Sequence, residues 1–444
     1  MKIKFLLLAS ICVASLAGCG GGGGSGPATV VGLNNLSLEA AGLETGKSLL
    51  LNVQSETTLV NYPWTVTSSN VLVTSKTASI VPNGRYTVTV TKQPLNQLCT
   101  VINGTSIPVL QDGNLVSIAI NCHSTYFNDT GVFTSDAAGD DATFGRDKLQ
   151  AQLTKTGSGV QGFDFTKICS NGASCSSALW ECVKDNVTGL TWTRAVYPWS
   201  NPAVSPNKCG YTDWRVPTVH ELMSILYGSD ASGVDLNFFD AATKLAISSD
   251  ISVDSAPNNY PWGVVFKTSN LVTTPPGAAG TATDAAGHGE FRWVRGGITD
   301  AMLARPANYS ASNGVIVDGN LDVMWWFPAA VQLKNWSNAL QSLTTLNTVT
   351  KPGGYNDWRL PNRSELDSVI DRSRSNPALG TSFLNAARTL DATLAQIPNV
   401  SVWTSTPAPG TSQAWTVDFR TGDITFNLKT DTYGVVYVRD KTRN

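Results

Sequence analysis

Few residues in this chain could do chemistry as a group. The three histidines, His123, His220 and His288, lie far apart in the sequence, which weakens a zinc site or a histidine-based triad. The sequence has no nucleophile elbow of the Gly-x-Ser-x-Gly type with triad partners, no His-Glu-x-x-His pair and no phosphate-binding loop. We therefore expect a protein that is not an enzyme, holds no metal and needs no cofactor.

The cysteines predict an exported chain with disulfide bonds. Two of the eight lie in the first twenty residues, and six remain, an even number that suits an oxidising compartment. Several connectivities are open, and the domain boundaries described below favour Cys99–Cys122, Cys169–Cys175 and Cys182–Cys209. Redox or thiol catalysis is the alternative, but no Cys-x-x-Cys motif or Cys/His pairing supports it.

The first residues have the features of an export signal. Residues 5–14 are mostly apolar, follow two lysines and are too few to span a bilayer. The Leu-Ala-Gly-Cys sequence that ends at Cys19 resembles a bacterial lipobox, in which a diacylglycerol is attached to the cysteine. We expect a signal peptide at 1–18, then the lipidated Cys19 with a Gly/Ser tether at 19–27. An ordinary secretory signal is the alternative.

Composition restricts the partners. Charged residues make up 14% of the 444 residues, against about 25% in an average soluble protein, and the net charge is −2. Proteins that bind nucleic acid are usually basic, because neutralised phosphates supply much of their affinity. We therefore expect no nucleic-acid partner. We expect contact with the bacterial outer membrane through the lipid anchor, while the oligomeric state stays open.

Residues 28–123 are expected to be all-β. Runs such as 48–53 and 86–90 are rich in alternating apolar and β-branched residues, and turn residues such as Asn83-Gly84 separate them. The segment from residue 86 to Cys122 resembles the small immunoglobulin-like sandwich modules of bacterial surface lipoproteins. Such modules usually act as stalks, so we expect a spacer.

An internal repeat organises the rest of the chain. Residues 210–222 recur as residues 354–366, with eight of 13 positions identical at an offset of 144. The Val-Arg pairs at 294–295 and 438–439 keep the same offset. The repeat predicts two copies of one fold, which we place at 124–300 (copy one) and 301–444 (copy two).

Each copy of the motif predicts a capped helix. In Asp-Trp-Arg-x-Pro-x-x-x-Glu-Leu a proline ends an extended stretch, and Thr218 or Asn362 then stands three residues before a glutamate, which is the pattern of a capping box. We expect the tryptophan in the core and the arginine paired with a carboxylate or a carbonyl; direct ligand contact is the alternative. The residues given this structural role are Asp213, Trp214, Arg215, Glu221, Asp357, Trp358, Arg359 and Glu365.

Copy two alone has a second predicted helix. Residues 336–343 carry apolar side chains at the i, i+3, i+4, i+7 spacing of one helical face. The corresponding part of copy one holds three prolines between residues 198 and 206, which cannot occupy a helix interior. A disulfide at Cys209 is expected to replace the packing of that helix.

The motifs carry a family resemblance. Residues 185–192, both Asp-Trp-Arg motifs and both Val-Arg endings are similar to the Lcl C-terminal domain family, and residues 127–167 match the lead-in of its long members. The resemblance implies a C-type-lectin-like fold, and the best-known member is an adhesin domain that engages sulfated polysaccharides. The expected architecture is multidomain, with an N-terminal all-β immunoglobulin-like sandwich followed by two α+β C-type-lectin-like domains.

Two groups of residues are candidates for ligand binding by that analogy. Sulfate recognition needs forked basic donors, and Arg363, Arg372 and Arg374 would supply them on or after the capped helix of copy two. A solvated basic helix end is the alternative. A neutral sugar would instead stack on an exposed aromatic face, and Trp325 and Trp326 lie in the densest aromatic cluster. Such clusters more often belong to the core.

The sequence thus favours a lipid-anchored cell-surface protein that binds a glycan in adhesion. A lipoprotein that assembles the envelope or binds another protein is the alternative. Formylglycine-generating enzymes share the implied fold and a Trp-Arg-Leu-Pro phrase, but they depend on reactive cysteines. Copy two has no cysteine, so this enzyme class is a remote alternative.

Overall fold

The computed structural model shows a multidomain chain that is mostly β-sheet, with few helices. The signal peptide, Cys19 and tether predicted at residues 1–27, and His288, lie outside the residues that it describes. No helix in the described residues is both long and apolar enough to cross a membrane. The described residues are 36–41, 43, 47–67, 73–74, 84–94, 97–101, 104–108, 116–124, 128–176, 178–199, 205–228, 232–242, 245–252, 261–266, 270–273, 289–296, 309–319, 321, 323–392, 397, 399–408 and 412–440.

The N-terminal part contains two four-stranded sheets that share one hydrophobic core. Side chains alternate along its strands, so that Leu49, Leu51 and Val53 are buried. A disulfide joins Cys99 to Cys122, which face each other on neighbouring strands. One sheet has β1 (Leu36–Ala41), β4 (Val73–Thr74), β6 (Gln97–Val101) and β8 (Val116–Ser124); the other has β2 (Leu49–Ser55), β3 (Asn61–Val66), β5 (Arg85–Lys92) and β7 (Ile107–Pro108).

Copy one is built on two sheets and a short helix, α2 (Val219–Ser224). The four-stranded sheet has β9 (Phe165–Ile168), β10 (Cys182–Asp185), β11 (Leu190–Thr193) and β17 (Val294–Gly296), in the order β17-β11-β10-β9. The other has β12 (Tyr197–Pro198), β13 (Leu245–Ile251), β14 (Pro261–Val265), β15 (Asn270–Thr273) and β16 (Gly289–Phe291), in the order β12-β16-β13-β14-β15. The disulfides Cys169–Cys175 and Cys182–Cys209 lie in this copy, so all three expected pairs are present.

Copy two repeats this arrangement with the same strand orders, which confirms the tandem repeat. One sheet has β18 (Tyr309–Ser312), β19 (Val315–Asp318), β20 (Val323–Trp326) and β26 (Tyr437–Asp440). The other has β21 (Leu333–Lys334), β22 (Ser401–Pro407), β23 (Gln413–Asp418), β24 (Ile424–Leu428) and β25 (Tyr433–Gly434). Its helices are α4 (Trp336–Thr345), α5 (Arg363–Asp367) and α6 (Thr381–Leu390). The second helix predicted for copy two is α4, which buries Trp336, Ala339 and Leu340.

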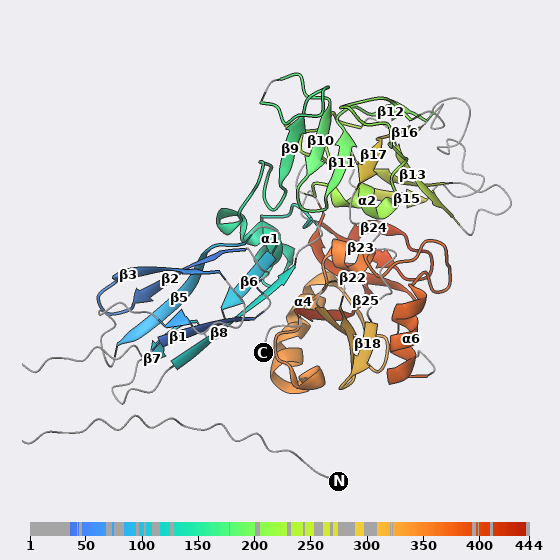
Figure 1. Ribbon diagram of the computed structural model, residues 1–444. Coiled ribbons are helices and arrows are strands. Elements are labelled where there is room, and N and C mark those ends of the chain that lie inside the picture. Colours follow the sequence, from blue (N-terminus) through green and yellow to red (C-terminus); the bar gives the residue numbers. More distant parts are fainter. Residues whose placement is uncertain are drawn as a thin grey trace, which may run out of the picture.

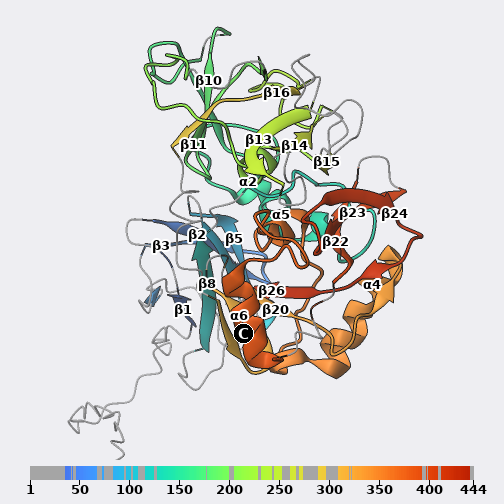
Figure 2. The same ribbon diagram turned by 90° about the vertical axis from the view of Figure 1, so that its right-hand side faces the viewer.

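The two copies pack on each other instead of standing apart. One hydrophobic cluster runs through both, and α2 contacts α5. The lead-in, defined here as residues 128–164, includes α1 (Gly145–Lys148), which lies where the N-terminal sheets and the two copies meet (Figure 1). Figure 2 shows α2 and α5 at the junction from the side. The lead-in falls within the range expected for copy one, and it also bonds to copy two, because Asn362 donates to Asp129 and Thr406 donates to Asp141.

Candidate functional site

The repeated motif forms the same ion pair in each copy. Arg215 donates two hydrogen bonds to Glu221, at 2.7 and 2.5 Å, and Arg359 donates two to Glu365, at 2.7 and 2.6 Å. Each glutamate also accepts a hydrogen bond from the backbone of its helix N-cap residue and so completes a capping box. Both carboxylate oxygens are therefore occupied within the protein.

The other motif residues are also engaged in the fold. Trp214 and Trp358 are buried and donate their indole N–H groups to backbone carbonyls. Asp213 pairs with Arg295, and Asp357 pairs with Arg439 on the closing strand, the Nε–Oδ1 distances being 2.7 and 2.6 Å. The geometry gives these side chains structural partners.

The predicted basic cluster of copy two does not form on the surface. Arg363 is fully buried, donates to the backbone carbonyl of Leu226 in copy one at 3.2 Å, and lies with its guanidinium 5.0 Å from the centroid of the Trp415 ring. Burial lowers the pKa of Arg363 to about 10. The prediction that Arg363 is a ligand residue is wrong, because the polar face of α5 is covered by copy one.

Arg372 is buried for the same reason. Its guanidinium pairs with Asp367 at 2.7 Å, and that carboxylate also bonds the ring of His220 in copy one at 2.7 Å. Arg374 is half-buried and donates to the hydroxyl of Thr381. These three arginines therefore do not present a joint anion site, and two of them belong to the contact between the copies.

The two candidate tryptophans have opposite surroundings. Trp325 is fully buried, donates to Asp318 at 3.4 Å and packs edge-on against Phe383. Its assignment as a ligand residue is wrong, because adjacent residues of a strand point to opposite faces and Trp325 faces the core. Trp326 is half-buried and lines a groove.

This groove runs along α4 and has a volume of about 650 Å³; we name it the α4 groove. The rings of Trp326 and Tyr437, paired across β20 and β26, lie 5.6 Å apart at an angle of 30°. The face of α4 that borders the groove is polar, and its side chains are amides and hydroxyls. The lining residues are Trp326, Gln332, Leu333, Lys334, Asn335, Asn338, Gln341, Ser342, Thr345, Leu346, Thr350, Thr432 and Tyr437.

Polar groups of the α4 groove are neutral, apart from one lysine. The hydroxyl groups of Tyr437 and Ser342 share a hydrogen bond of 2.9 Å, and burial raises the pKa of Tyr437, so that the phenol keeps its proton at neutral pH. Asn338 and Gln341 are exposed on α4, one helical turn apart. No Asp or Glu is among the lining residues.

The described residues of copy one do not form the same groove, because one equivalent residue differs and the helix that borders the groove is not among them. Trp192 pairs with Val294 in copy one, and Trp325 pairs with Val438 in copy two, so these two tryptophans are equivalent. The next residue is Thr193 in copy one and Trp326 in copy two. Thr193 is buried. No helix equivalent to α4 is present in the described residues of copy one.

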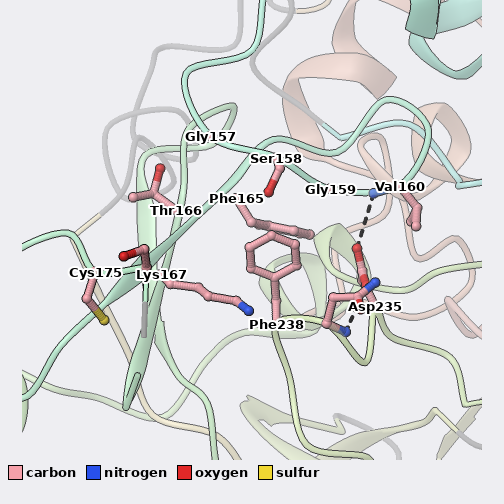
Figure 3. A pocket seen from close by; sticks show the side chains of 12 residues that line it. Gly157, Ser158, Gly159, Val160, Phe165, Thr166, Lys167, Cys175, Asp235 and Phe238 are labelled. Atoms are coloured by element: carbon pink, nitrogen blue, oxygen red, sulfur yellow. Dashed lines mark hydrogen bonds between the residues drawn. The ribbon is translucent and has the colours of Figure 1, made fainter. Parts of the chain in front are cut away.

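Copy one has a different pocket, which Figure 3 shows from close by. It has a volume of about 520 Å³ and lies between β9, the loop at Gly157–Val160 and the turn that carries Asp235 and Phe238. Apart from Cys175, which was expected in a disulfide, its lining residues carry no role predicted from the sequence, since none of them belongs to the repeated motif.

A buried acid cluster joins the lead-in to copy two. Asp141 is 1% exposed, and its Oδ2 accepts hydrogen bonds from the hydroxyls of Thr130, at 2.5 Å, and Thr406 of β22, at 2.8 Å. Burial, together with the charge of Asp129, raises the pKa of Asp141 to about 8, and burial also raises the pKa values of Asp129 and Asp147. In the described part of the chain no group of three or more acidic, histidine or cysteine side chains is arranged to hold a metal ion.

Comparison with known proteins agrees with the architecture of the two copies. Residues 181–295 and 314–439 each match the Lcl C-terminal domain, and together they cover more than half of the chain. No curated protein matches the chain. The matched stretches contain the motif ion pairs of both copies and end at Arg295 and Arg439, the partners of Asp213 and Asp357. The chain therefore belongs to the Lcl C-terminal domain family, with two tandem copies of the domain.

Proposed function

We propose that this chain is a lipid-anchored bacterial surface protein that binds a glycan in the α4 groove and catalyses no reaction. The observation that carries the proposal is the pairing of a half-buried tryptophan that lines the groove with a row of amides and hydroxyls. Sugars present an apolar C–H face and a rim of hydroxyl groups, and aromatic rings and neutral hydrogen-bonding groups complement both. Trp326 supplies the ring, and Asn338 and Gln341 supply the amides.

The charge of the groove favours a neutral glycan over a sulfated one. Sulfate recognition calls for clustered arginines or lysines, whereas Lys334 is the single cation among the lining residues. Arg363 and Arg372, on which the sulfated alternative depended, are buried. The proposed ligand is therefore an uncharged oligosaccharide of a few sugar units.

Two observations support a role without catalysis. Hydrolysis of a glycosidic bond generally needs a pair of carboxyl groups, and no carboxylate lines the groove. The formylglycine-generating class needs free thiols, and each cysteine in the described residues is bonded to another cysteine. A protein partner is the competing possibility, which the exposed side chains of Val331 and Leu333 near the groove would favour.

The remaining assignments belong to the same proposal. The lipobox-like sequence at Cys19 supports anchoring at the outer membrane. The two N-terminal sheets with one shared core support an immunoglobulin-like spacer. In each copy the last strand lies at the edge of its sheet and pairs with a strand from early in the copy, β17 with β11 and β26 with β20, and this supports a C-type-lectin-like domain. The spacer would hold the α4 groove away from the membrane.

A glycan array with the chain from residue 20 onward tests the proposal. We expect saturable binding to neutral glycans that changes little between low and high salt. Trp326→Ala should weaken it about tenfold or more, because losing one stacking partner costs roughly 1–2 kcal/mol. Trp199→Ala is the matched control, since Trp199 is equally half-buried but lies in copy one.

Further variants and the salt dependence of binding distinguish a neutral glycan from a sulfated glycan and from a protein partner. Asn338→Ala should also weaken binding, while Asn385→Ala, an exposed amide on α6 of the same copy, should not. Binding confined to sulfated glycans and abolished by salt would refute the neutral-glycan proposal. Absence of any glycan binding by the folded chain would favour the protein-binding alternative.

A further inference from the structure

The pocket of copy one contains an ammonium group without a counter-charge. The Lys167 Nζ lies 3.6 Å from the centroid of the Trp180 ring and 5.4 Å from that of Phe238. No carboxylate in the described residues pairs with it. Aromatic faces hold a cation in place but do not use its hydrogen-bond donors. The ammonium group can therefore donate to an incoming anion.

The acidic residue of the pocket is already satisfied. Asp235 is 4% exposed, and one of its oxygens accepts from the backbone N–H of Val160 at 3.1 Å. The other accepts from the backbone and the amide of Asn237, at 3.0 and 2.9 Å. Figure 3 shows Asp235 tied to the loop and directed away from Lys167. Lys167 thus supplies the accessible charge of the pocket.

The rest of the pocket suits a hydrocarbon better than a sugar. Phe165 and Phe238 form the floor, but they are only 1% and 4% exposed, so they offer no open ring face for stacking. Val160 adds an aliphatic wall. The amide of Asn237 is used by Asp235 and the Thr166 hydroxyl accepts from Asn186, which leaves the Ser158 and Ser176 hydroxyls as neutral side-chain partners among the lining residues. The Ser158 hydroxyl extends from the loop toward the Phe165 ring (Figure 3).

We propose that this pocket, named the Lys167 pocket, is a second ligand site of the protein and binds a carboxylate carried on an aliphatic body. The carboxylate would pair with Lys167 and the Ser158 hydroxyl, and the aliphatic part would lie against Val160 and the small part of the Phe165 and Phe238 side chains that borders the pocket. The C-terminal residue of a peptide has this chemistry, as does a free N-acyl amino acid. The volume of about 520 Å³ is sufficient for one such residue with part of its neighbour. The site is separate from the α4 groove and does not depend on the function proposed there.

Saturation-transfer NMR with the chain from residue 20 onward tests this site, with N-acetyl-leucine as the probe. We expect N-acetyl-leucine to bind, and N-acetyl-leucinamide, which lacks the negative charge, to bind at least tenfold more weakly. Lys167→Gln should weaken N-acetyl-leucine binding by a similar factor, and Lys167→Arg should largely restore it. Lys184→Gln is the matched control, because Lys184 is an exposed lysine on the adjacent strand β10.

Three results would overturn the proposal. They are equal binding of the acid and the amide, unchanged binding by Lys167→Gln with its fold intact by circular dichroism, and stronger binding of glucuronate than of N-acetyl-leucine. A peptide that ends in leucine and its C-terminally amidated form distinguish a chain terminus from a free amino acid as the natural source. Trp326→Ala should leave N-acetyl-leucine binding unchanged, so failure at one site is separable from failure at the other.

Discussion

Replacing Asp141 with asparagine should remove much of the pH dependence of stability in this protein. Asp141 is buried between the lead-in and β22, and its pKa is raised to about 8 by burial and by the charge of Asp129. In the unfolded chain an aspartate has a pKa of about 3.9. Between these values the folded protein keeps the proton and the unfolded chain releases it. Stability therefore falls as pH rises from about 4 to about 8.

The size of the effect follows from the pKa difference. One pH unit between the two pKa values changes the free energy of unfolding by about 1.4 kcal/mol for one group. From pH 5 to pH 7 the contribution of Asp141 is a loss of roughly 3 kcal/mol. The raised pKa values of Asp129 and Asp147 act in the same direction. Asparagine has no proton to lose, and its side-chain carbonyl can still accept from the hydroxyls of Thr130 and Thr406.

Urea unfolding followed by tryptophan fluorescence at pH 5, 6, 7 and 8 measures the difference. We expect the free energy of unfolding to fall less steeply with pH in Asp141→Asn than in the unchanged chain, so that the variant is the more stable protein at pH 8. Asp431→Asn, an exposed aspartate of copy two, should keep the slope of the unchanged chain. The reasoning fails if Asp141→Asn follows the same slope or loses stability equally at every pH.

Two further predictions concern the ion pairs. Burial alone would lower the pKa of His220, but the adjacent Asp367 carboxylate raises it above its usual value. The stabilising charge of the His220 ring is therefore fully present below about pH 6.5 and is lost as pH rises through the raised pKa. His220→Gln should therefore cost about 1–2 kcal/mol at pH 5.5 and clearly less at pH 9 in urea unfolding, and an equal cost at both pH values would contradict the pairing. Glu365→Gln should lower the free energy of unfolding by about 3 kcal/mol at pH 7, because Asp440 is then the one carboxylate paired with Arg359 and the cap of α5 is weaker. A decrease below about 0.5 kcal/mol would show that the pair is not structural.

The features that depend on local spacing could be predicted from the sequence. The capping boxes at Thr218 and Asn362 and the helix that starts at Trp336 follow from residues within one or two helical turns. The repeat predicted two copies because each motif recurs with its distant Val-Arg partner. Assigning each cysteine to a domain predicted Cys99–Cys122, and the pairs favoured for the four cysteines of copy one are also present.

Burial between domains could not be predicted in this way. Amphipathic spacing shows which face of α5 is apolar, but it does not show that the opposite, polar face is covered by the other copy. For this reason the sequence pattern places Arg363 and Arg372 on the surface, whereas they contact Leu226 and Asp367 in the interior. The contacts of the lead-in acids do not follow from local spacing, because Asp141 reaches Thr406 across 265 positions of sequence.

The α4 groove lies at positions where the two copies differ, whereas an internal repeat is recognised by the positions at which they agree. Trp326 replaces Thr193, and Tyr437 stands one residue before Val438, as Trp293 stands before Val294. The period of two in a strand places Trp325 and Trp326 on opposite faces of β20. A comparison of unlike positions in the two copies is therefore the better guide to function in this chain.

The position of the lead-in has a mechanical consequence. The polypeptide runs from the N-terminal sheets through the lead-in into copy one and only then into copy two. However, Asp129 and Asp141 bond directly to Asn362 and Thr406, and Asp136 pairs with Lys429, all of which belong to copy two. A pull applied between the N-terminal sheets and the α4 groove therefore has a second, non-covalent route that bypasses copy one. Tension would be shared between both routes, so copy one could stretch only after these three links had broken.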